Sequence, residues 1–204
     1  VTIEGSGTLA FNRSDTALNV ANQITGNGVV TQIGSGTTTL SGSSSGSALS
    51  FVMAAGTLAT GVDDAINTTG SLIFGATYGG TETGALDLTN GGVTAGGLLV
   101  QTNTVAANQI TIGVGKTLTV NGDVTIGVNI ANDTNSALAI SGGGSFVVNR
   151  AGGTFQVGGA TGTVNGNKAV LDMSGLGAFT ANMGTTGVFR VGDSNSNSAG
   201  TGNA

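Results

Sequence analysis

Aspartates are the residues of this 204-residue chain that come closest to a catalytic set. The chain has no His and no Cys, which excludes a Ser-His-Asp triad, a thiol nucleophile and an imidazole metal site. Glycoside hydrolysis would need two carboxyl groups held across a cleft. Asp63-Asp64 is the one adjacent acidic pair, and neighbouring residues of a strand face opposite ways.

Three further aspartates could form a cluster if their strands stacked in register. Asp87, Asp123 and Asp172 each lie in or beside a strand-like run and could line one outer face. The simpler interpretation is that all three are solvated outward positions. The chain also lacks the Gly-Gly-x-Gly-x-Asp repeat of calcium-binding rolls. We therefore predict no catalytic, cofactor-binding or metal-binding residue, no cofactor and no enzyme activity.

Threonine, tyrosine and glycine give weaker signals. Thr37-Thr38-Thr39 and Thr117-Leu118-Thr119 could contribute to a flat, ice-binding kind of surface, but the pattern does not recur in register. Tyr78, beside Gly79-Gly80, is the aromatic residue expected at the surface, and one tyrosine is a weak argument for sugar binding. Gly142-Gly143-Gly144 is no phosphate loop, because no Gly-Lys-Ser/Thr follows it.

Short sequence motifs bounded by glycine recur along the chain. They read as strands, and these strands would position the side chains named above. Gly70-Ser-Leu-Ile-Phe-Gly75, Gly153-Thr-Phe-Gln-Val-Gly158 and Gly187-Val-Phe-Arg-Val-Gly192 are three of them. Each alternates large apolar residues with Thr, Gln or Arg, as a strand with one buried face does. About twenty such runs at roughly ten-residue spacing predict a β-solenoid. A β-sandwich of hairpins predicts similar spacing and remains the alternative fold.

The composition fits short strands joined by bends that contain glycine. The chain has 39 Gly and no Pro. The absence of Pro suits a sheet, because a Pro in a central strand removes one backbone hydrogen bond to the neighbouring strand. Glycine-rich chains are often disordered, but 38% of these residues are hydrophobic and are placed in alternation. Four Asn-Gly pairs mark bends, at residues 27–28, 90–91, 121–122 and 165–166.

Charge and hydropathy argue against binding to nucleic acid and insertion into a membrane. The net charge is −5, and the five cations are scattered (Arg13, Lys116, Arg150, Lys168 and Arg190), so we expect no nucleic-acid binding. The longest weakly polar stretch, residues 48–62, is too short for a membrane helix, so we expect no membrane insertion by this segment.

The expected organisation is one solenoid over residues 1–192 and a Gly/Ser/Asn tail or inter-rung loop over 193–204. Residues 41–47 read as a linker outside the stack, and 48–67 are ambiguous between strand and helical turn, with strand favoured for 49–53. The remaining predicted strands are 1–4, 9–11, 18–20, 29–33, 38–40, 72–74, 86–88, 98–101, 109–112, 118–120, 124–126, 138–140, 146–148, 155–157, 170–172, 179–181 and 189–191.

Two internal matches suggest the size of a rung. The phrase at 153–158 returns at 187–192, and Gly5-Ser6-Gly7-Thr8 returns as Gly34-Ser35-Gly36-Thr37. Two or three short strands with their corners fill roughly 20–30 residues, the size of one solenoid turn. The chain starts strand-like without a Met and reads as an excised piece, and neither end carries an evident polar cap. We expect adjacent repeats, or copies of the chain stacked end to end, to cover these ends.

The N-terminal phrases go beyond periodicity. GSGTLAFNRSD at residues 5–15 and ITGNGVVTQIGSGTTTLSG at residues 24–42 resemble the autotransporter-associated β-strand repeat of bacterial surface passengers. Residues 1–47 are thus the repeat-like part, and the rest is similar in style to the long proteins that carry this repeat. The chain departs from them in having no recognisable membrane-barrel segment.

The resemblance implies a right-handed parallel β-helix. At roughly 20–30 residues a turn, the chain length predicts about seven to ten rungs. It also implies an extracellular or outer-surface location and a non-catalytic role as passenger stalk, adhesion or filament scaffold. The alternative is a carbohydrate-active β-helix enzyme or a polysaccharide-binding module, with cell-surface polysaccharide as partner.

Overall fold

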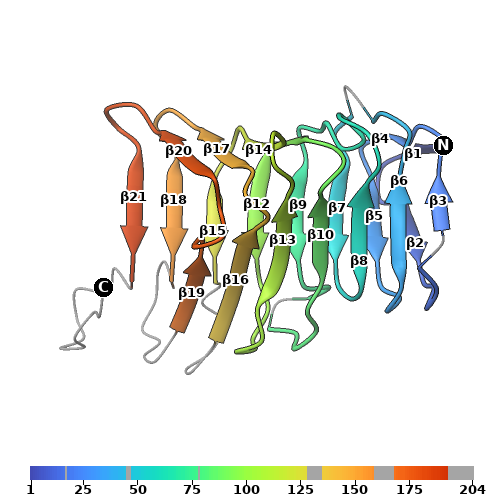
Figure 1. Ribbon diagram of the computed structural model, residues 1–204, viewed down its shortest axis with the longest axis horizontal. Helices are drawn as coiled ribbons and strands as arrows, with labels where there is room; N and C mark the ends of the chain where they lie inside the picture. Colours follow the sequence, from blue (N-terminus) through green and yellow to red (C-terminus); the bar gives the residue numbers. More distant parts are fainter. Residues whose placement is uncertain (17, 45–46, 78, 128–134, 159–167, 193–204) are drawn as a thin grey trace.

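The computed structural model is a parallel β-helix of eight coils, which follow one another in chain order along its length (Figure 1). It describes residues 1–16, 18–44, 47–77, 79–127, 135–158 and 168–192. The first seven coils each cross three faces in the same order, the described part of the eighth crosses two, and every strand pair is parallel. The predicted solenoid is therefore confirmed, and the hairpin sandwich is excluded. No helix in the described part of the chain is long and apolar enough to cross a bilayer.

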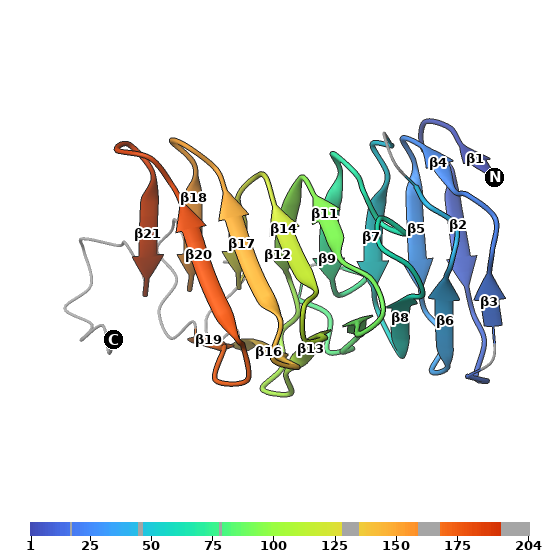
Figure 2. The same ribbon diagram turned by 45° about the horizontal axis from the view of Figure 1, so that its top comes forward.

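The three faces differ in the number of their strands. Figure 2 shows strands of each face. The first face comprises β1 (Thr2–Ile3), β4 (Thr25–Gly26), β11 (Val93–Ala95), β14 (Thr117–Val120), β17 (Ser145–Asn149) and β20 (Ala178–Asn182). The second has β2 (Thr8–Phe11), β5 (Val29–Gln32), β7 (Ser50–Met53), β9 (Ser71–Phe74), β12 (Gly97–Val100), β15 (Val124–Ile126), β18 (Thr154–Val157) and β21 (Val188–Val191). The third has β3 (Leu18–Val20), β6 (Thr37–Leu40), β8 (Thr57–Thr60), β10 (Ala85–Leu88), β13 (Asn108–Ile112), β16 (Asn135–Ser141) and β19 (Lys168–Asp172).

In the middle of the first face, isolated parallel bridges take the place of strands. Ser47 pairs with Thr68, and Asn67 pairs with Thr94, between the strand pair β1–β4 and the four-stranded sheet that begins at β11. The face is thus continuous, although two of its crossings are too short to count as strands.

Inward side chains stack in columns, because each strand pairs with the next in an unbroken register. On the second face Phe51 aligns with Leu72, Leu72 with Leu98, and Leu98 with Val124. On the third face Leu58, Leu86 and Ile110 align in the same way. These side chains are at most 2% exposed. A buried side chain of this kind stabilises the fold by about 1.5–3 kcal/mol, so the continuous core offsets the many glycine corners.

The coils lengthen toward the C-terminus while the register of the core is kept. One inward column of the second face shows this by its residue numbers, which run Leu9, Val30, Phe51, Leu72, Leu98, Val124, Phe155 and Phe189. The match between the phrases at 153–158 and 187–192 is therefore one coil, since Phe155 pairs with Phe189. The match between the phrases at 5–8 and 34–37 is not a coil, because they precede β2 and β6, which lie on different faces.

Three strands have no counterpart in the sequence predictions. β4 has two residues, while β8 and β11 each contain a single large apolar residue, so alternation gives little signal. Tertiary pairing with full-length neighbours is what makes them strands. Strand is confirmed for residues 50–53 in the ambiguous stretch, and no helix forms there.

Two described residues of the predicted external linker, Ser44 and Ser47, are in fact part of the stack. Ser44 is 1% exposed, and its hydroxyl donates to the carbonyl of Ala65 (2.8 Å) and accepts from the amide of Asn67. Ser47 is buried too, at its bridge with Thr68. Ser44 can be buried because the neighbouring coil supplies hydrogen-bond partners for its hydroxyl, which composition cannot reveal.

Buried glutamine side chains stabilise the bends between the second and third faces. Gln32 and Gln156 donate to the carbonyls of Gly34 (2.8 Å) and Gly158 (2.7 Å), two residues further on. Alternation predicts an outward side chain for Gln156, but it is 3% exposed. Its bond to the corner carbonyl explains the burial.

The asparagine-glycine pairs at residues 27–28, 90–91 and 121–122 lie at bends between strands, and no hairpin forms there. A Cβ on Gly122 would lie 1.7 Å from the carbonyl oxygen of Gly96, so only glycine fits beneath the coil before. The fourth pair, 165–166, and the 193–204 tail lie outside the described residues.

Candidate functional site

A shallow polar depression lies on the corner between the third and first faces. Its volume is about 240 Å³, and it spans the bends that precede the first-face crossings of three successive coils. The residues that line it with polar side chains are Asp63, Asp64, Thr94, Lys116, Thr117 and Thr119. The middle bend is Gly91-Gly92, which has no side chains to fill the space between its neighbours.

Asp63 is fixed by groups from two other coils. Its Oδ1 accepts from the amide of Gly92 (2.7 Å) and from Nζ of Lys116 (2.9 Å). The Gly92 hydrogen bond, followed by the Lys116 interaction, lowers the pKa of the Asp63 carboxyl from its ordinary value. An acid that remains ionised at neutral pH is poorly suited to be a general acid.

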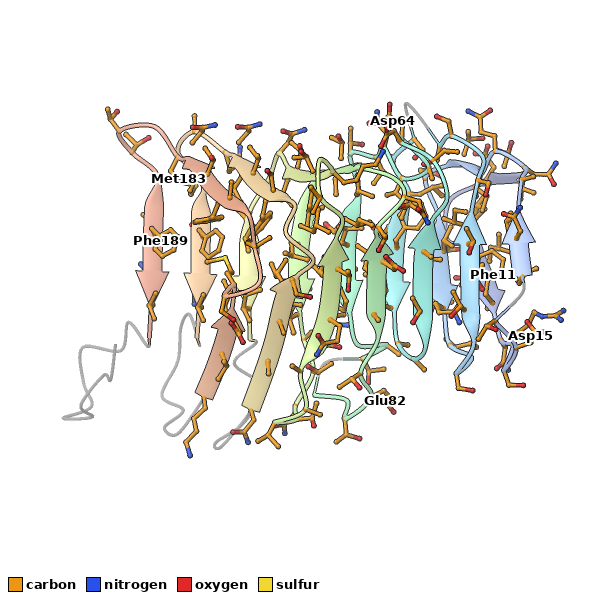
Figure 3. All side chains as sticks on the ribbon, viewed as in Figure 1. Phe11, Asp15, Asp64, Glu82, Met183 and Phe189 are labelled. Carbon is orange, nitrogen blue, oxygen red and sulfur yellow. The ribbon has the colours of Figure 1, made fainter. Side chains whose placement is uncertain are left out.

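Asp64, which is labelled in Figure 3, is another lining residue of this depression and turns the chain there. It has a φ of 59°, the left-handed conformation that Asp tolerates better than most residues, and it is the one described non-glycine residue with a positive φ. Its carboxylate accepts from Nδ2 of Asn67 (3.2 Å), and its carbonyl accepts from the amide of Ser44. Asp64 therefore serves the bend, and its carboxylate is engaged within its own loop.

The three aspartates that could have stacked do not come together. Asp87 and Asp172 both lie on the third face, but three strands apart and in different outward columns. Asp123 lies at the corner before β15 on the second face. The described residues contain no group of three acidic side chains that could hold a metal ion.

Each of these aspartates binds a backbone amide at a corner. Asp87 accepts from the amide of Thr89, and Asp172 accepts from that of Ser174, both at 2.9 Å and two residues on. The backbone bond, followed by the Ser174 hydroxyl, lowers the pKa of the Asp172 carboxyl. Asp123 accepts from the amide of Thr154 in the next coil (2.9 Å) and pairs with Arg150. These carboxylates thus satisfy amide groups that bends leave without strand partners.

The hydroxyl rows on the surface are short. Thr94 and Thr119 are neighbours on the first face, but Val147 follows them, and the Thr37–Thr57 pair on the third face is followed by Ala85. No described face carries the regular threonine array of an ice-binding surface. Tyr78 lies outside the described residues.

Sequence reasoning missed Lys116 and Thr94 as neighbours of Asp63. Both lie in later coils, far from it along the chain, and coil lengths must be known before they can be brought together. The glycine pair at 91–92 is the local signal that a gap lies between them. The arrangement can donate and accept hydrogen bonds to a polar ligand.

Comparison with known proteins gives no match: no family model, no curated protein and no solved structure matches this chain.

Proposed function

We propose that this chain is a non-catalytic structural segment of a bacterial extracellular or cell-surface protein, a scaffold in a stalk, adhesin or filament. The observation that carries the proposal is the use of its carboxylates. Asp63, Asp87, Asp123 and Asp172 each accept a backbone amide at a corner, on bends distributed over the molecule. Side chains used in this way stabilise the stack.

The resemblance of residues 5–15 and 24–42 to the autotransporter-associated repeat supports an outer-surface location. The unbroken register of the inward columns supports the scaffold role, since a parallel β-helix can be extended coil by coil. The proposed partners are further coils of the same kind, and the competing function is carbohydrate-active chemistry on this scaffold.

Two measurements test the proposal. Antibodies against the purified chain should label intact cells of the organism that carries the gene as strongly as permeabilised cells. The purified chain should release no sugar from a panel of bacterial and plant polysaccharides. Turnover that disappears in the Asp87→Asn, Asp123→Asn or Asp172→Asn variant would establish an enzyme instead, and labelling confined to permeabilised cells would refute the surface location.

Polysaccharide binding without turnover is a second candidate, favoured by the depression beside Asp63. Its hydroxyl, carboxylate and ammonium groups suit a sugar chain lying across three coils. Binding measured by calorimetry with the same panel should be lost in Thr94→Val and Thr119→Val together. Binding that survives both changes places the ligand elsewhere.

A further inference from the structure

The asparagine-glycine pairs at the bends bring a chemistry of their own. Glycine has no side chain, so its backbone nitrogen can approach the side-chain carbonyl carbon of a preceding asparagine. A bond forms between that nitrogen and that carbon, the backbone nitrogen loses its proton, and the side-chain nitrogen leaves as ammonia. Water then opens the resulting cyclic imide at either of its carbonyl groups, which gives an aspartyl or an isoaspartyl residue. The reaction requires a glycine nitrogen that is free and a bend that can rotate.

Exposure does not distinguish the pairs that lie in the described part of the chain. Asn27, Asn90 and Asn121 are all exposed, so water reaches each side-chain amide. Each is followed by glycine, so the next residue does not distinguish them either. Their hydrogen bonds do differ, and these bonds determine which glycine nitrogen is free to react.

The pair Asn27-Gly28 is held by hydrogen bonds on its backbone and on its side chain. The amides of Asn27 and Gly28 donate to the carbonyl of Ile3, at 2.9 and 3.2 Å. The side-chain oxygen of Asn27 accepts from the amide of Gly5 (2.6 Å). Attack by the Gly28 nitrogen would break bonds to the first coil, so local opening must come first.

The pair Asn121-Gly122 is held on its backbone only. The amide of Asn121 donates to the carbonyl of Ala95 (2.9 Å), which fixes the asparagine against the preceding coil. The side chain of Asn121 and the amide of Gly122 make no hydrogen bond to the described residues. The attacking nitrogen is free here, but the asparagine cannot turn toward it without losing its bond to Ala95.

The pair Asn90-Gly91 has neither constraint. Within the described ranges, no hydrogen bond involves the backbone amide or the side chain of Asn90, or the amide of Gly91. Gly91 is also buried, and a buried amide without a partner costs free energy. In the imide this nitrogen carries no hydrogen, so the unpaired donor disappears. The fold therefore favours the imide at this bend more than at the other two.

We propose that Asn90 is a modification site, at which the chain deamidates without an enzyme and forms an isoaspartyl link to Gly91. Ammonia leaves and a water molecule is taken up, so the reaction needs no oxidant, reductant or cofactor. The site goes beyond the proposed scaffold function and does not depend on it, because the reaction requires only this bend.

The product alters the polar depression, since an isoaspartyl link adds a methylene group to the main chain between residues 90 and 91. The carbonyl of Gly91 accepts from the hydroxyl of Thr60 (2.7 Å), and the amide of Gly92 donates to Asp63 (2.7 Å). A Cβ on Gly91 would lie 1.9 Å from the carbonyl oxygen of Val62, so the lengthened backbone has no free space there. One of these hydrogen bonds must break, and the modified chain is expected to be less stable than the original.

Peptide mass spectrometry on the full, folded chain tests the proposal. The chain is kept in mildly alkaline buffer, samples are digested with pepsin in acid at intervals, and the deamidated fraction at each asparagine-glycine pair is measured. Conversion should be fastest at Asn90, slower at Asn121, and at least about tenfold slower at Asn27 than at Asn90. The same chain in concentrated urea is the control, because the three pairs should convert at similar rates once their hydrogen bonds are gone. Electron-transfer fragmentation distinguishes isoaspartate from aspartate.

The Asn90→Gln variant connects the modification to its effect. Glutamine keeps a side-chain amide but would have to form a larger ring, so this variant should show no product at position 90 and an unchanged rate at Asn121. After equal storage, the wild-type chain should unfold at a lower urea concentration than before, whereas the midpoint of the variant should stay the same.

The assignment is overturned if Asn90 in the folded chain converts no faster than Asn27, which would show that the local sequence alone sets the rate. Faster conversion at Asn121 overturns it too, because the modification site would then lie at that bend. A urea midpoint that stays unchanged after Asn90 has converted overturns the predicted effect on the depression.

Discussion

Lys116 Nζ lies 2.9 Å from Oδ1 of Asp63, a residue two coils earlier, and the side chain reaches it across the glycine bend at Gly91-Gly92. The same carboxylate accepts the amide of Gly92 (2.7 Å), so one aspartate connects three successive bends. Such bonds connect neighbouring coils at the bends, just as the backbone hydrogen bonds between strands connect the coils on the faces. They also make stability depend on the charge of the carboxylates.

We expect acid to destabilise the fold through Asp63 and Asp172. The pKa of each carboxyl is lowered in the folded chain, by the amides of Gly92 and Ser174 respectively and then by Lys116 or the Ser174 hydroxyl. The unfolded chain, with ordinary aspartate pKa values of about 3.9, takes up protons first as the pH falls. This stabilisation is fully present above that value and is lost as the pH drops from there through the lower folded-state pKa values. Urea unfolding at a series of pH values measures it.

The matched variant for this prediction is Asp63→Asn with Asp172→Asn. The double variant should show a weaker pH dependence below about pH 4, because two of the groups that link proton uptake to unfolding are gone. An unchanged slope would show that other carboxylates carry the acid sensitivity.

Gly122 should tolerate no side chain. In Gly122→Ala the new Cβ meets the carbonyl oxygen of Gly96 at 1.7 Å, and that backbone cannot move without breaking the neighbouring coil. We expect a loss of more than about 3 kcal/mol in the free energy of unfolding. Gly115→Ala is the control: it has a φ of +76° but nothing within 4 Å of the new atom, so about 1–2 kcal/mol is expected. Equal losses in denaturant unfolding would show that backbone conformation, and not coil contact, decides both positions.

Two buried threonines of adjacent strands should respond oppositely to valine. Thr38 is 1% exposed and its hydroxyl has no hydrogen-bond partner among the described residues, so Thr38→Val should be neutral or stabilising by up to about 1–3 kcal/mol. Thr60 is equally buried, but its hydroxyl donates to the carbonyl of Gly91 (2.7 Å). Thr60→Val should therefore cost about 1–3 kcal/mol. Thermal or urea unfolding of the pair checks this, and a loss at Thr38 would indicate a bridging water at that hydroxyl.

Amide exchange should alternate along β21 at low protein concentration. The amides of Val188 and Gly192 are bonded to the preceding coil, whereas those of Phe189 and Val191, which alternate with them along the strand, point to its other side. Hydrogen exchange followed by NMR should find the first two more protected, and central strands such as β9 more protected than either. Equal protection of neighbouring residues in a monomeric sample would mean that another segment already pairs with this edge.

The sequence by itself determined the class of fold, because alternation of side chains is local. Runs such as 72–74, 118–120 and 155–157 read as strands from their own residues, and glycine and asparagine corners between them predict a stack of short strands. The absence of His and Cys also limits the possible chemistry without any structure.

Only the tertiary structure decided which residues are neighbours. Coils of unequal length cannot be aligned from a local pattern, and one wrong length shifts every cross-coil pair. Asp87 and Asp172 therefore fell into different columns, whereas Asp63 met Lys116. Strand formation at β4, β8 and β11 and the burial of Ser44 depend on partners in the next coil. Side-chain alternation is set within a strand, but contacts between coils are set by the summed lengths of all the bends between them.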